Sequence, residues 1–129
     1  MSFGALLVDT IQASTEIPTV FQNKDGVELG RLCRAFVQFN LDEDNHLEIT
    51  QAFNVSSIAC QGIGRYVVKF ALDLDTDSYC SFAVSQEAVN VKTGNTVAGK
   101  QTQKQCTIEV TNKEGLPSNG GQINFVVFA

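Results

Sequence analysis

Several residue types are scarce in this chain, and each shortage excludes a class of protein. The 129 residues include no tryptophan, one histidine and only nine basic residues against fourteen acidic ones. Lys92, Lys100 and Lys104 form the only loose basic stretch, so a nucleic-acid-binding surface, which needs clustered Lys and Arg, is not expected. No apolar run approaches the roughly 18 residues of a membrane-spanning helix, and the first ten residues lack the basic segment of a secretory signal.

The cysteines are not arranged as metal ligands. Cys33, Cys60, Cys80 and Cys106 are widely spaced, and His46 is the only histidine that could join them. A zinc site needs closely spaced ligand pairs, so none is expected. Each cysteine lies in or beside an apolar stretch, which predicts reduced, buried thiols; a disulfide between neighbouring strands is the alternative.

Alternation of polar and apolar residues predicts an all-β fold, a small antiparallel β-sandwich or barrel. In residues 65–72, Tyr66, Val68, Phe70 and Leu72 fall on one face, as in a strand with one buried side and one largely exposed side. The segments 61–64 and 73–77 on either side have the composition of turns. A chain of this length suits one domain, which would bury roughly two-thirds of its unfolded surface.

Further strands are expected over residues 32–39, 46–55, 78–84, 106–111 and 122–129, and residues 85–93 carry apolar residues and end in a turn. In the first of these the odd-numbered residues, from Cys33 to Phe39, form the better apolar face. Residues 112–121 are rich in Gly and Pro, which predicts a surface loop. The predicted core includes Val68, Phe70, Phe82, Ile108, Phe125 and Val127.

Residues 1–30 differ from the rest of the chain. Pro18 excludes a helix there, and the turn residues 23–26, which end in Asp25-Gly26, predict a hairpin between residues 19–22 and 27–30. An extended segment followed by a small hairpin has too few neighbours in its own sequence to be stable alone. We therefore expect residues 1–30 to form an arm that contacts another subunit, and residues 31–129 to form a single β-sandwich domain.

Three stretches imitate chemical motifs incompletely. Residues 94–101, GNTVAGKQ, match part of a phosphate-binding loop, but Gln101 replaces the required hydroxyl residue and no helix is predicted to follow. The spacing of Asp73, Asp75 and Asp77 matches the start of an EF-hand loop, but the glycine and glutamate that such a loop requires are absent. The stretch is therefore either a carboxylate-rich turn or a cation site of another kind.

The third stretch is acidic, and its members suggest either a metal site or solvent-facing residues around a turn: Asp42, Glu43, Asp44, His46 and Glu48. No nucleophile motif places a serine near His46. Asn54 begins a glycosylation sequon, which matters only in a secreted protein. We expect no catalytic, cofactor-binding or metal-binding residues, no cofactor and no enzyme activity.

Three segments, LVDTIQASTEIPTVF (7–21), GRLCRAFVQFN (30–40) and FNVSSIACQGIGRYVVKF (53–70), resemble a family of small structural proteins of tailed bacteriophages, especially phages of aquatic bacteria. The family pattern is D-T-I-Q-x-S-T, then C-R-A-[WF]-V-x-F-N, then F-N-V-S-S-I and G-x-G-x-Y-x-V-x-F. The resemblance covers roughly residues 6–72. It fades where LDLDTDSYC replaces the family's A-M-P-x-x-x-Y segment.

The resemblance implies a non-enzymatic virion protein, assembled in the bacterial host cytoplasm, that decorates or reinforces the capsid or forms a fibre-like appendage. By analogy with fibres and capsid decorations we expect a homotrimer that contacts other virion proteins such as the major capsid protein, with no nucleic-acid or membrane partner. The alternative is a carbohydrate- or receptor-binding β-sandwich module, since exposed sandwich loops often carry such sites.

Overall fold

A computed structural model of the chain describes residues 4–15, 19–41, 44, 46–86, 90–93 and 101–129. The chain divides into two compact units, Met1–Leu32 and Cys33–Ala129. Within the described residues there are ten strands and no helix. The predicted all-β fold is therefore confirmed.

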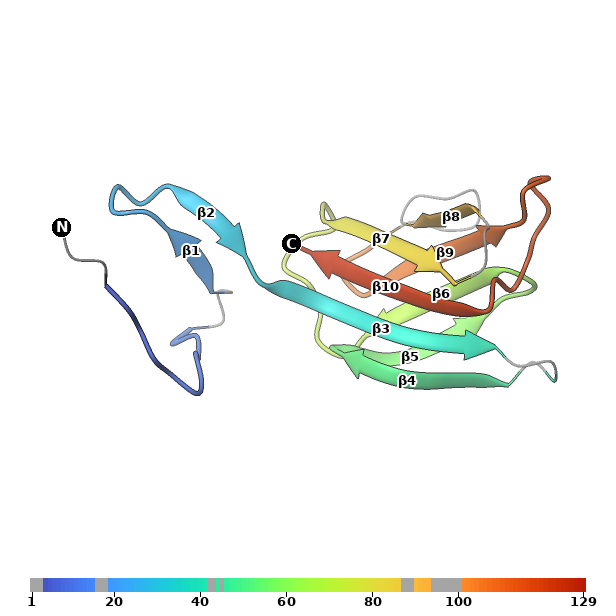
Figure 1. Ribbon diagram of the computed structural model, residues 1–129, viewed down its shortest axis with the longest axis horizontal. Helices are drawn as coiled ribbons and strands as arrows, with labels where there is room; N and C mark the ends of the chain where they lie inside the picture. The colour runs from blue at the N-terminus through green and yellow to red at the C-terminus, as the bar shows by residue number, and fades with distance from the viewer. Residues whose placement is uncertain (1–3, 16–18, 42–43, 45, 87–89, 94–100) are drawn as a thin grey trace. The chain divides into compact units, whose positions relative to one another are not determined.

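The larger unit is an antiparallel sandwich of two four-stranded sheets, shown in Figure 1. The first sheet has the order β4 (Leu47–Phe53), β3 (Cys33–Leu41), β10 (Gln122–Phe128), β7 (Cys80–Ser85). The second sheet has the order β5 (Val55–Cys60), β6 (Arg65–Phe70), β9 (Gln105–Thr111), β8 (Asn90–Thr93). The chain passes between the sheets four times, from β4 to β5, from β6 to β7, from β7 to β8 and from β9 to β10.

The core lies between the two sheets and is supplied by alternate residues of their central strands. On β3 the buried residues are Ala35, Val37 and Phe39, the odd-numbered face that the sequence predicted. The remaining core residues of the strands are Tyr66, Val68, Phe70, Cys106, Ile108, Val110, Ile123, Phe125 and Val127. Five of the six predicted core residues are among them, and the sixth, Phe82, is not.

The placement of Phe82 in the core was wrong. Its side chain is 55% exposed, because Phe82 lies opposite Val126 on β10 and shares the outward direction of that residue. Phe125 and Val127 point inward on the same strand, so the core-facing partner on β7 is Ala83, opposite Phe125. The larger apolar residues of β7 thus face away from the core.

The predicted strand 46–55 is broken at Asn54, which has a φ of 53°. Its side-chain amide donates to the carbonyl oxygens of Arg34 and Leu72, and its Oδ1 accepts the backbone N–H of Leu72. These bonds hold the corner at which the chain leaves the first sheet for the second. They also place Leu72 beyond the end of β6, where it is 75% exposed and not buried as predicted.

Two tyrosines anchor loops to the core. Tyr66 packs edge-on against Phe39, with ring centroids 5.1 Å apart, and its hydroxyl donates to the Asn119 carbonyl oxygen in the loop 112–121. Tyr79 donates to the carbonyl oxygens of Thr102 and Gln105, both at 3.0 Å. Burial raises the pKa of Tyr66 to about 12, so its hydroxyl remains a donor at neutral pH.

The smaller unit contains the predicted hairpin, β1 (Val20–Gln22) paired with β2 (Glu28–Arg31). Asn23 Oδ1 accepts the backbone N–H groups of Asp25 and Val27, and Gly26 supplies the positive φ of the turn. Residues 4–15, called the N-terminal segment below, form no strand and are all exposed. None of the described buried residues belongs to this unit, so it has no core of its own.

The prediction of four buried thiols was wrong for Cys60 and Cys80, which are exposed; Cys106 is buried and Cys33 is half-buried. All four are free. A charged thiol reagent should therefore modify Cys60 within minutes in the native protein and Cys106 only after unfolding. Mass spectrometry of tryptic peptides measures both, and native labelling of Cys106 as fast as that of Cys60 would contradict the structure.

A candidate assembly surface on the first sheet

The described residues of the stretches that imitate chemical motifs do not come together as a site. Residues 94–100 of the phosphate-loop-like stretch lie outside the described residues, and Gln101 donates its side-chain amide to the carbonyl oxygens of Asp77 and Tyr79. Asp75 forms an ion pair with Arg34 at 3.0 Å. The loop 73–77 is thus tied to its neighbours by structural bonds.

The acidic stretch is only partly described, since Asp42 and Glu43 lie outside the described residues. Among the residues that are described, no group of three His, Cys, Asp or Glu side chains is placed to hold a metal ion. Likewise, no helix in the described part of the chain is long and apolar enough to cross a membrane.

The first sheet has an unusually apolar outer face, the side turned away from the core. Strand pairing places one residue from each strand in a row that is wholly apolar: Phe53, Phe36, Val126 and Phe82. The rings of Phe36 and Phe53 lie 5.8 Å apart, and Phe82 stacks on Phe128 at 6.3 Å. All four phenylalanines are exposed. Contiguous exposed apolar residues of this kind usually mark an interaction site.

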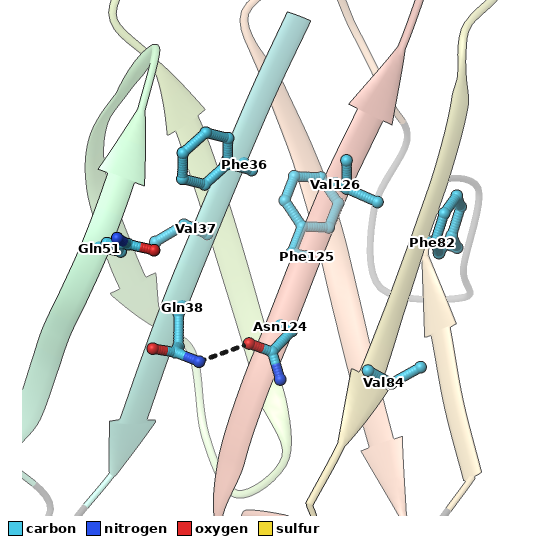
Figure 2. A pocket seen from close by; sticks show the side chains of 9 residues that line it. All are labelled: Phe36, Val37, Gln38, Gln51, Phe82, Val84, Asn124, Phe125 and Val126. Atoms are coloured by element: carbon cyan, nitrogen blue, oxygen red, sulfur yellow. Dashed lines mark hydrogen bonds between the residues drawn. The ribbon is translucent and has the colours of Figure 1, made fainter. Parts of the chain in front are cut away.

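A second row on the same face is uncharged and carries three amide side chains and one valine. It consists of Gln51, Gln38, Asn124 and Val84, in the order of the strands. The Gln38 side-chain amide donates to Asn124 Oδ1 at 2.9 Å, as Figure 2 shows. Amide side chains offer both donors and acceptors, so this row can bond to a partner's backbone without carrying a charge.

Between the two rows the face is hollowed. The hollow has a volume of about 230 Å³ and is lined by residues of all four strands of the sheet. Figure 2 shows Phe36 on one side of β10 and Phe82 on the other, with the smaller Val126 and Asn124 between them. Small-molecule pockets typically measure about 300–1,000 Å³ and enclose their ligand. This hollow is smaller and open, which suits an elongated partner better than a small ligand.

The outer face of the second sheet is different, because charged residues lie across its middle. Arg65 and Lys92 both lie opposite Glu109, and the Arg65 guanidinium is 3.6 Å from the Glu109 carboxylate. A charged face of this kind is already well solvated. Of the two sheets, the first alone therefore exposes an apolar face. The outer face is the set of these residues on that sheet: Phe36, Gln38, Gln51, Phe53, Phe82, Val84, Asn124, Val126 and Phe128.

The N-terminal segment is a second exposed apolar surface. Its large apolar side chains are all at least half-exposed, Leu7 most of all at 95%: Leu6, Leu7, Val8 and Ile11. Asp9 is its only charged residue among those described. The segment therefore presents its apolar side chains to solvent.

Sequence reasoning identified the arm but missed the outer face. The missed signal is that β3 and β10 carry large apolar residues on both faces, with Phe36, Val126 and Phe128 at the positions that should be polar in a half-exposed sheet. Comparison with known proteins gives no match: no family model, no curated protein and no solved structure is significantly similar to the chain. The function therefore has to be inferred from the chain's own surfaces.

Proposed function

We propose that the protein is a non-enzymatic structural subunit of a phage virion, which decorates or reinforces the capsid or forms a fibre-like appendage. The observation that carries the assembly part of the proposal is the presence, in one chain, of two exposed apolar surfaces: the outer face and the N-terminal segment. Exposing both in an isolated monomer is unfavourable, whereas a subunit of a symmetric assembly covers them with neighbours. The virion setting is supported by the resemblance of residues 6–72 to phage structural proteins.

A homotrimer is the assembly we propose, with other virion proteins such as the major capsid protein as further partners. Removal of residues 1–32 tests the role of the arm. All described buried residues lie outside this unit, so the remaining sandwich should fold. We expect multi-angle light scattering to show an oligomer for the full chain and a monomer for the truncated one, with unchanged β-type circular dichroism.

An oligomer of unchanged mass after truncation would show that the arm does not hold the assembly together. A full-length chain that is itself monomeric would reject the assembly role. It would favour a carbohydrate- or receptor-binding module, for which the amides of Gln38 and Asn124 beside exposed aromatic rings are suitable groups. Glycan-array screening of the monomer would then be the next measurement.

A further inference from the structure

We infer that the outer face is the docking surface for the N-terminal segment of a second copy of this chain. This inference rests on the proposed function, which requires an assembly but does not say which surfaces meet. It assigns the two exposed apolar surfaces to each other, the segment of one copy lying in the hollow of the next.

The shape of the outer face suits an extended chain. The hollow is centred on Asn124 to Val126 of β10, with the rings of Phe36 and Phe82 on either side and Val126 as part of its floor. At about 3.3 Å per residue, the seven residues of β10 extend over roughly 23 Å and the twelve residues 4–15 can extend over roughly 40 Å. The segment is therefore long enough to follow the whole strand.

The chemistry of the two surfaces also matches. Successive side chains of an extended segment point to opposite sides, so Leu6, Val8 and Thr10 share one side, and Asp9 lies between Leu7 and Ile11 on the other. The side with Leu6 and Val8 carries no charge, so it is the side that meets the apolar sheet.

The Gln38–Asn124 amide row can pair with the segment's backbone N–H and C=O groups. The nine residues of the outer face are uncharged, and the one carboxylate in the next row is Glu48 on the edge strand β4. The outer face itself therefore does not repel the segment, whose only described charge is Asp9.

The area is sufficient for a specific contact. Five half-exposed apolar side chains present an apolar area on the order of 500 Å² on the outer face. Covering it, together with the matching surface of the segment, buries about 1,000 Å², the lower bound for a stable interface. The contact is head-to-tail, since each copy supplies one segment and receives another, and such contacts close into rings such as a trimer.

Three variants of the full chain test this pairing, and each adds one negative charge. L6D alters the segment on the side that meets the sheet, at a residue that is 77% exposed. V84D alters the outer face at a residue that is 57% exposed, and S57D alters an exposed strand residue of the second sheet as a control. A buried, unpaired carboxylate is costly, so L6D and V84D should each weaken assembly by about a hundred-fold or more. S57D should assemble like the wild type. Circular dichroism checks that all three are folded.

Mixing the two defective variants then distinguishes the pairing from other contacts. L6D retains an intact outer face and V84D retains an intact segment, so an equimolar mixture of the two monomers should form a heterodimer by light scattering. Failure of the mixture to associate would overturn the inference, because a segment that binds its own chain, or two outer faces that bind each other, cannot be rescued in this way.

Two other results would also overturn it. Normal assembly of V84D would show that the segment docks elsewhere. The proposed function would still stand in that case, provided that removal of residues 1–32 converts the full-length oligomer to a monomer. Normal assembly of L6D would show that the segment is not the docking element. A monomeric wild-type chain is the separate result that rejects the proposed function.

Discussion

Replacing Phe125 with alanine is expected to lower the free energy of unfolding by about 3–5 kcal/mol, the usual cost of removing a buried phenylalanine ring. Phe125 is 2% exposed on the central strand β10 and lies between Val37 on β3 and Ala83 on β7. The small Ala83 cannot fill the space, so the cavity would persist. Urea denaturation followed by circular dichroism measures the loss.

The matched control is Phe82, the same residue type one strand away. F82A should cost less than about 1 kcal/mol, because its ring is 55% exposed and its main neighbour is the exposed ring of Phe128. Both variants should be measured in the chain lacking residues 1–32, since subunit contacts would otherwise add to stability. Equal losses from F125A and F82A would contradict the assigned orientation of β7.

Alternation along the chain was sufficient to predict the central strands. In β3, β6, β9 and β10 the residues expected to face inward do so, because each of these strands has a neighbour on both sides and a face against the core. The hairpin at Asn23 and the loop at 112–121 were also predictable, because Asp-Gly and clustered Gly and Pro act locally.

The orientation of β7 was not predictable in this way. Its sequence alternates, with Phe82 and Val84 on one face and the small residues Ala83 and Ser85 on the other. Alternation alone assigns the larger residues to the core, and the structure places the smaller ones there. Alternation shows which face of a strand carries the larger apolar residues. It does not distinguish a face that packs in the core of the same chain from a face that contacts a neighbouring subunit.

Long-range bonds explain the other errors. The break at Asn54 depends on carbonyl groups of Arg34 and Leu72, which lie 20 and 18 residues away in the sequence. Leu74 and Tyr79 were missing from the predicted core because they belong to a loop, yet Leu74 N–H donates to the Gln103 carbonyl oxygen and both side chains are buried. Neither contact leaves a local signature in the sequence.

Replacing Gly64 with alanine should also be severely destabilising, by about 2–5 kcal/mol, through backbone strain and overpacking together. Gly64 has a φ of 70°, and an added Cβ would lie 2.4 Å from the Val110 carbonyl oxygen and 2.6 Å from that of Ser118. Both obstacles are backbone atoms. They cannot move aside easily, because the Ser118 N–H donates to the Val110 carbonyl oxygen and the Val110 N–H donates to that of Gly64.

Gly115 separates the two contributions, because it has a similar φ of 83° but no atom within 4 Å of an added Cβ. G115A should therefore lower the free energy of unfolding through backbone strain alone, by about 1–2 kcal/mol. The additional loss of stability in G64A measures the close approach of the loop 112–121 to the turn before β6. If G64A costs no more than G115A, the loop yields to the added methyl group. The bonds from Gly64 N–H and the Tyr66 hydroxyl to Asn119 would then be too weak to fix the loop in place.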